Sequence, residues 1–116
     1  MVFVNIKTMI IVSKFMVPKG YQGLTFFPFV FLKHKILKTD KVLMNHESIH
    51  LRQQIELFVV FFYLFYGLEF FIRLLYCRNW YKAYRNISFE REAYYNEANL
   101  NYLQGRPFWR FIKYMF

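Results

Sequence analysis

Residues 40–67 read DKVLMNHESIHLRQQIELFVVFFYLFYG, and this stretch decides the fold. Asp40 is a suitable N-terminal helix cap, and no proline or glycine interrupts the chain from there until Gly67. The pattern predicts a helix over residues 41–66. We expect the chain to turn back at Gly67 into a second helix over residues 68–84, so that the two helices form an antiparallel hairpin.

A third helix is expected over residues 88–103, because Gly105 and Pro107 follow it and would stop it. Residues 104–116 then remain as an aromatic and basic tail.

The first 40 residues indicate β-structure. Two short β-branched runs, residues 2–6 and 9–13, are typical of strands. Residues 24–32 are aromatic and β-rich but contain Pro28, which favours an edge strand, and the basic residues 33–40 are expected to form a hairpin tip. The sequence therefore predicts an α+β fold, in which a short N-terminal β-element, a hairpin or edge strand, precedes the helical hairpin and the third helix.

Length and composition limit the class of protein. With 116 residues the chain has room for one domain, made of a β-rich part (1–40), a helical core (41–103) and the tail (104–116). Its hydrophobic fraction of 57% excludes a disordered or low-complexity chain. A single cysteine, Cys77, excludes an intramolecular disulfide framework.

The net charge of +9 suits an anionic neighbour such as a membrane surface. Nucleic acid is not the expected partner, because the aromatic residues occur in consecutive apolar blocks and do not alternate with basic residues as in a stacking platform.

One motif indicates metal chemistry: His46-Glu47-Ser48-Ile49-His50 reads H-E-x-x-H. Residues four apart lie on one face of a helix, so His46 and His50 can reach a single ion. Glu47 then lies beside them, placed to take a proton from water. The alternative is a structural helix whose two histidines face solvent or pair with carboxylates.

A catalytic zinc site needs a third protein ligand and leaves one position open for water. Glu90, Glu92 and Glu97 all lie on the third predicted helix, about 40 residues after the motif. His34 is the only other histidine, and it lies in a lysine-rich segment.

This combination resembles the gluzincin metallopeptidases, in which the H-E-x-x-H helix is followed by a helix that bears a glutamate ligand. The extension H-E-x-x-H-x-x-Q-Q of small members of that group matches Gln53 and Gln54, and the likeness covers residues 45–101. The resemblance implies a minimal zincin-like fold and a zinc-dependent hydrolase that acts on a peptide or protein. In such an enzyme His46 and His50 bind the zinc and Glu47 is the general base.

The resemblance leaves two alignments for the third ligand. Glu90 is preferred, because Ala93 then matches the family's small residue and lets the two helices approach closely. Glu92 is the alternative, with Asn96 at the position where the family has Asp or Asn; in the Glu90 alignment Tyr94 stands there. The donor for the developing oxyanion stays open among several side chains: Tyr84, Tyr94, Tyr95 and His34.

The apolar residues 57–76 raise the question of a membrane span. Their length suits a bilayer, but Glu69 and Arg73 lie among them, so hydropathy alone leaves the question open. A single crossing would place His50 and Glu90 on opposite sides of the bilayer, which excludes a shared ion. The turn at Gly67 avoids this conflict, and Glu69 and Arg73 then form an i,i+4 pair.

A chain of this size cannot bury all of its aromatic residues, so an exposed apolar patch is expected, against which a membrane surface or a second copy of the chain can pack. No cleavable signal peptide is recognised, and we expect an intracellular or peripheral membrane location. The alternative function is that of a non-enzymatic, membrane-associated helical protein.

Overall fold

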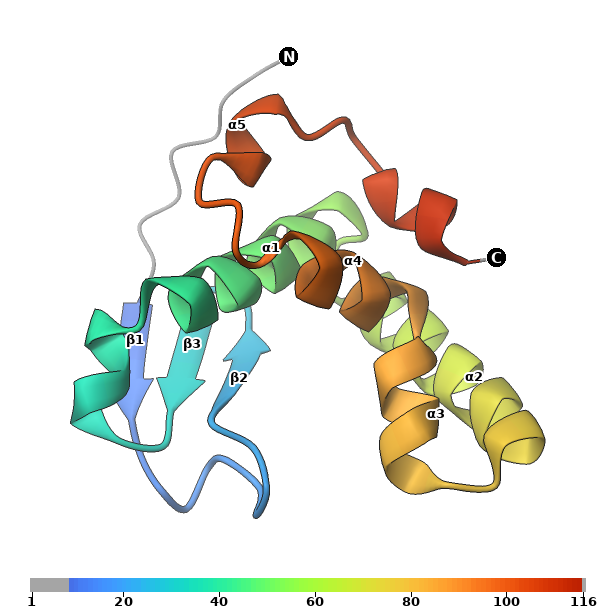
Figure 1. The fold of residues 1–116 in the computed structure, drawn as a ribbon, viewed down its shortest axis with the longest axis horizontal. Helices are drawn as coiled ribbons and strands as arrows, with labels where there is room; N and C mark the ends of the chain where they lie inside the picture. The colour runs from blue at the N-terminus through green and yellow to red at the C-terminus, as the bar shows by residue number, and fades with distance from the viewer. Residues whose placement is uncertain (1–8, 116) are drawn as a thin grey trace.

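The computed structural model describes residues 9–115 and has a small three-stranded sheet followed by helices, so the predicted α+β class is confirmed (Figure 1). The strand expected over residues 2–6 lies outside the described residues. All of the other predicted elements can be compared with the structure.

The sheet has the order β1-β3-β2. Strand β1 (Met9–Val12) runs parallel to β3 (Phe29–Leu32), and β2 (Gly23–Phe26) pairs with β3 antiparallel. The single edge strand predicted over residues 24–32 is therefore wrong. Pro28 lies in the turn between β2 and β3, where no ladder hydrogen bond needs its missing N–H group.

The predicted hairpin tip at residues 33–40 is also wrong, because the tip lies at Phe27 and Pro28. Residues of this basic segment instead form a short 3-10 helix, η1 (Lys35–Thr39), that leads from the sheet into the first long helix.

Helix α1 (Lys41–Glu56) begins where the sequence predicts, and Asp40 caps it by accepting a hydrogen bond from the Leu43 backbone N–H at 3.0 Å. It ends ten residues earlier than predicted. Phe58 and Val59 have positive φ angles of 56° and 63°, and Val60 N–H donates to the Phe58 carbonyl at 2.6 Å. This γ-turn, and not Gly67, separates the two helices.

The reason for the early turn is packing. Leu57 and Phe62, on the two sides of the bend, are buried in one cluster with Ile87 and Phe89. Gly67 lies inside α2 (Val60–Cys77), where a helix tolerates it. Burial of large side chains from distant segments has outweighed the local signal.

After α2 the chain reverses into α3 (Trp80–Asn86), and α4 (Ser88–Asn96) follows after a bend at Ile87. The helical hairpin of this fold therefore consists of α2 and α3 (Figure 1). The predicted ion pair between Glu69 and Arg73 is wrong. The Glu69 carboxylate instead accepts hydrogen bonds from Ser88, and Arg73 donates to the Met115 carbonyl.

The predicted third helix, residues 88–103, ends at Asn96. The Asn45 side-chain amide donates to the carbonyls of Asn96, Glu97 and Asn99 at 3.3, 2.8 and 2.9 Å, and so binds carbonyl groups freed at the helix end. Two short pieces follow, α5 (Tyr102–Gly105) and the 3-10 helix η2 (Arg110–Tyr114).

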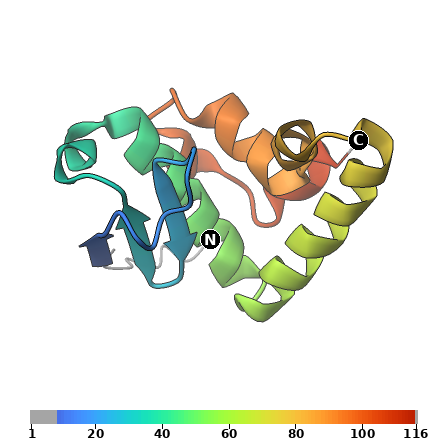
Figure 2. The same cartoon turned by 90° about the horizontal axis from the view of Figure 1, so that it is seen from below.

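Helix α1 lies at the centre of the arrangement. The sheet packs on one side of it, through a cluster of Val30, Leu32 and Leu51, and α4 packs on another. Viewed from below, the sheet and α2 stand on opposite sides of α1 (Figure 2). The side chains of α1 that point between them form the floor of a cavity.

Candidate metal centre

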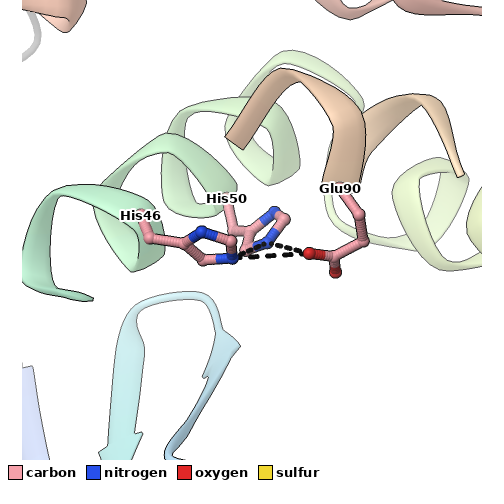
Figure 3. Close-up of side chains that lie close together, drawn as sticks. All are labelled: His46, His50 and Glu90. Carbon is pink, nitrogen blue, oxygen red and sulfur yellow. Dashed lines mark hydrogen bonds and ion pairs between the residues drawn. The ribbon is translucent and has the colours of Figure 1, made fainter. Parts of the chain in front are cut away.

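Three side chains from two helices converge at this floor (Figure 3). His46 and His50 lie one turn apart on α1, and Glu90 reaches them from the first turn of α4. The Nε2 atoms of the two histidines are 3.2 Å apart, and Glu90 Oε1 lies 3.0 Å from His50 Nε2 and 3.4 Å from His46 Nε2. All three side chains are buried.

These separations fit a zinc ion. Ligand atoms about 2.0–2.1 Å from a tetrahedral zinc lie about 3.3 Å from one another. The three measured distances of 3.0, 3.2 and 3.4 Å are close to that value. Two imidazoles and one carboxylate also form a donor set that occurs in catalytic zinc sites with an open fourth position.

Glu92 does not take part in this cluster. Its carboxylate is fully buried on another face of α4, where it binds the guanidinium of Arg106 and accepts from the Tyr102 hydroxyl at 2.7 Å. His34 is exposed at the start of η1. Of the two glutamates that the sequence leaves open, the structure brings Glu90 to the histidines.

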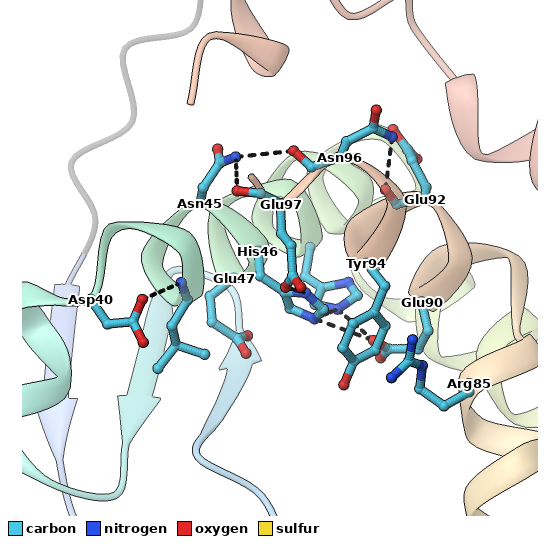
Figure 4. Close-up of polar contacts among 12 residues, drawn as sticks. Asp40, Asn45, His46, Glu47, Arg85, Glu90, Glu92, Tyr94, Asn96 and Glu97 are labelled. Atoms are coloured by element: carbon cyan, nitrogen blue, oxygen red, sulfur yellow. Dashed lines mark hydrogen bonds and ion pairs between the residues drawn. The ribbon is translucent and has the colours of Figure 1, made fainter. Parts of the chain in front are cut away.

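Each histidine is oriented by a second hydrogen bond from its other ring nitrogen. His46 Nδ1 lies 3.0 Å from Glu97 Oε2 (Figure 4). His50 Nδ1 lies 2.8 Å from Gln53 Oε1. Glu90 is fixed in the same way, because its Oε2 accepts from the Tyr66 hydroxyl at 2.7 Å. Such partners hold the ligand rings in the orientation that directs both Nε2 atoms to one point.

Sequence reasoning did not assign these orienting residues. Glu97 follows Glu90 by seven residues, which is two helical turns, so the spacing places both on one face of the third helix. Gln53 belongs to the quoted H-E-x-x-H-x-x-Q-Q pattern, but its role becomes visible only in the structure. Tyr66 has no local signal, because it is one of ten tyrosines.

The cluster is electrostatically coupled. Burial lowers the pKa of His50, but the adjacent Glu90 carboxylate outweighs burial and raises the pKa to about 9. Burial conversely raises the pKa of Glu90, and the two histidines outweigh it and hold that pKa well below its usual range. In the absence of a metal ion, His50 and Glu90 therefore form a buried ion pair near neutral pH.

Glu47 lies on the same helix and extends towards β2 (Figure 4). Its Oε2 accepts a short hydrogen bond from the Thr25 hydroxyl. Gly23 faces the same carboxylate so closely that a Cβ atom there would lie 3.1 Å from Glu47 Oε1. Strand β2 therefore fixes the position of this carboxylate from behind.

A cavity of about 420 Å³ is lined by four residues of the candidate site: His46, Glu47, His50 and Glu90. One wall is β2, with Gly23, Leu24 and Thr25, and the opposite wall comes from α2 and α3. That second wall is mostly aromatic and includes Phe62, Tyr63, Tyr66, Phe70, Trp80 and Tyr84. A largely apolar cavity with a few convergent polar groups is the usual form of a small-molecule or peptide site.

The tyrosines that the sequence offers as oxyanion donors lie at different distances from the cavity. Tyr84 lines the cavity, and its hydroxyl lies 2.9 Å from that of Tyr94, whose ring packs edge-on against His46. Burial, with the Glu90 charge, raises the pKa of Tyr84, which keeps it a hydrogen-bond donor. Tyr95 is 80% exposed and points away.

A buried network of hydrogen bonds and ion pairs connects the cluster of His46, His50 and Glu90 to the C-terminal segment. Gln53, which orients His50, donates to Glu92 Oε1 at 3.0 Å. Arg106 is 1% exposed and binds both Glu92 and, at 2.7 Å, Glu56 Oε2. This series of contacts, from Arg106 through Glu92 and Gln53 to His50, joins the C-terminal segment to α1.

Comparisons of the chain with protein-family models, with curated proteins and with solved structures find no match.

Proposed function

We propose that this protein is a zinc-dependent, metallopeptidase-like hydrolase that acts on a peptide or protein. The observation that carries the proposal is the convergence of His46 Nε2, His50 Nε2 and Glu90 Oε1 within 3.4 Å of one another at the floor of a cavity. The resemblance of the H-E-x-x-H segment to the gluzincins supports the same reading.

In this proposal His46, His50 and Glu90 hold the zinc. The zinc supplies a Lewis acid for the substrate carbonyl and makes water more acidic. Glu47 takes a proton from the attacking water and passes it to the amine that leaves when the peptide C–N bond breaks. Thr25 keeps the Glu47 carboxylate in place, and Tyr84, which lines the cavity and is kept protonated by its raised pKa, is the proposed donor to the oxyanion.

Metal content tests the ligand set. The purified protein should hold one zinc per chain, measured by elemental analysis after dialysis. We expect Glu90→Gln and His46→Ala to lose stoichiometric zinc, whereas Glu47→Gln retains it. Asp40→Asn is the matched control, because it makes the same carboxylate-to-amide change in the most exposed acid and still caps α1.

Hydrolysis tests the reaction. A mixed library of fluorogenic peptides should be cleaved by the zinc-loaded protein and by Asp40→Asn, and Glu47→Gln should lose at least about 100-fold in rate. A wild-type protein that binds no zinc on titration would refute the proposal. Zinc binding without any cleavage, equal in wild type and Glu47→Gln, would leave a metal site but no hydrolase.

The alternative is a non-enzymatic, membrane-associated protein in which the His46 helix is structural. The exposed apolar surface of α2 favours it. Unchanged thermal stability and an unchanged lack of zinc in His46→Ala would support this alternative over the hydrolase.

A further inference from the structure

The exposed apolar patch that composition leads us to expect lies on α2. We call it the outer face of α2, and its residues recur every three or four positions and are all exposed: Val60, Phe61, Leu64, Phe65, Leu68, Phe71, Ile72, Leu75 and Tyr76. The opposite face of α2 lines the cavity. The helix is therefore apolar on both sides, and among residues 9–115 only the cavity side has a partner.

Among the described residues, α2 is the one helix that is long and apolar enough to cross a membrane, by length and composition alone. Its polar contacts favour a different placement. Tyr66, Glu69 and Arg73 bind Glu90, Ser88 and the Met115 carbonyl respectively. A crossing helix would draw these groups and α4 into the hydrocarbon, whereas a helix lying along the surface leaves them on the protein side.

The charge distribution points to the partner. Of the seven acidic residues, all of them within the described chain, only Asp40 is exposed; the others are buried or half-buried in the contacts of the core and the candidate site. Nine basic residues of the described chain are exposed: Lys14, Lys19, Lys35, Lys38, Lys41, Arg78, Lys82, Arg85 and Lys113. The exposed charge of the described residues is thus almost entirely positive.

Part of this charge lies next to the outer face. Arg78 follows the last residue of α2, and Lys82 lies on α3, which packs against α2. Arg85, also on α3, instead stacks its guanidinium on the Tyr94 ring. Trp80 and Tyr81, between Arg78 and Lys82, are 71% and 58% exposed. Tryptophan and tyrosine beside basic residues are typical of the membrane–water interface.

We propose that the outer face of α2 docks on an anionic lipid bilayer, with the helix parallel to the surface and Arg78 and Lys82 among the headgroups. A second copy of the chain is a poorer occupant, because it carries the same cationic surface and two copies repel one another. An anionic lipid surface supplies both an apolar layer and the opposite charge. The proposal goes beyond the hydrolase function and does not depend on zinc.

Sedimentation with vesicles tests the docking. Wild-type protein should bind vesicles of phosphatidylcholine with one-third phosphatidylglycerol, and bind at least about tenfold more weakly to pure phosphatidylcholine or at high salt. The triple variant Leu64→Gln, Leu68→Gln, Leu75→Gln should lose at least about tenfold in affinity for the anionic vesicles. Its matched control changes three exposed apolar residues elsewhere, Phe15→Gln, Ile36→Gln and Leu100→Gln, and should bind as wild type does.

A second variant, Arg78→Gln with Lys82→Gln, keeps the test valid if the apolar variant fails to fold, because both side chains are exposed. It should weaken binding to the anionic vesicles and leave zinc content unchanged. The proposal is overturned if folded outer-face and charge variants bind the vesicles as wild type does, or if neutral vesicles bind equally well. It is also overturned if light scattering shows a wild-type dimer that the outer-face variant converts to monomer without loss of vesicle binding.

Discussion

At the scale of single residues, the positions around Glu47 are the most sensitive to small changes. The Glu47 carboxylate lies between the Thr25 hydroxyl, which binds it, and the backbone of Gly23, which leaves just enough room for it. In the proposed reaction this carboxylate must reach a water molecule, so a small displacement of the carboxylate should lower the rate of hydrolysis.

We expect Gly23→Ala to lower the rate of hydrolysis by about tenfold without loss of zinc. The new Cβ atom would lie 3.1 Å from Glu47 Oε1 and displace it by a few tenths of an ångström, whereas none of its three nearest atoms belongs to the proposed zinc ligands. Parallel measurements of zinc content and peptide cleavage test this. Gly105→Ala is the control, because nothing lies within 4 Å of its added Cβ atom. A loss of zinc in Gly23→Ala would contradict the expectation.

The His50 pKa predicts a proton effect on zinc binding. Because the neighbouring carboxylate raises this pKa to about 9, metal-free His50 carries a proton at pH 7, and zinc binds only the neutral imidazole. Binding should therefore release a proton from His50, and zinc affinity should rise about tenfold per pH unit until pH 9. Calorimetric titrations in two buffers of different ionisation enthalpy measure the release. Zinc binding at pH 7 without proton release would be inconsistent with the buried His50–Glu90 ion pair.

At the scale of elements, the bend between α1 and α2 is the feature that sequence patterns could not reveal. Phe and Val both disfavour positive φ, so nothing local in Phe58 or Val59 suggests a turn, whereas Gly67 does suggest one. The turn exists because it lets Leu57 and Phe62 reach Ile87 and Phe89, which are 25 to 32 residues away in sequence. Contacts over that distance have no periodic signature.

The strained backbone at Val59 gives a stability prediction. Glycine adopts a φ of 63° without steric cost, so Val59→Gly should raise the free energy of unfolding by about 1 kcal/mol. The same substitution on exposed helix, Val42→Gly in α1, should lower it by about 0.5 kcal/mol. Urea denaturation of both variants measures the two effects. A destabilised Val59→Gly would show that packing of the valine side chain outweighs the backbone strain.

At the scale of the whole molecule, the proposed metal links the segments that carry the core. The ligand helices α1 and α4 are 40 residues apart at His50 and Glu90, and without zinc they are joined there by a buried ion pair. Zinc binds the folded arrangement and not the unfolded chain, so it should stabilise the fold.

Removal of zinc by a chelator should lower the melting temperature by about 10 °C when the reference sample holds free zinc at about 100 times its dissociation constant. Thermal melts followed by circular dichroism measure the shift. Glu90→Gln is the comparison, and it should melt at one temperature with or without zinc. An equal zinc effect in both proteins would place the stabilising ion elsewhere.

The sequence predicts the class of fold and the residues that can form the cluster, because both follow from local spacing: His46 and His50 are four positions apart, and a glutamate-bearing helix follows downstream. It favours Glu90 over Glu92 only through the alignment of Ala93 with a small residue of the resembled family. That distinction depends on Arg106, which lies outside any motif and binds Glu92 away from the histidines. The strand order and the caps of the C-terminal helices likewise depend on contacts between segments that are distant in sequence.

The γ-turn at Val59 has a mechanical consequence. Helix α2 extends about 27 Å beyond it, so a rotation of about 10° at that one residue would swing the far end of the helix by about 5 Å. Such a swing would change the width of the cavity by more than the length of a carbon–carbon bond. Tyr66, Glu69 and Arg73 form hydrogen bonds at increasing distances from the turn along α2. Together these bonds oppose the rotation and hold α2 in place as a wall of the cavity.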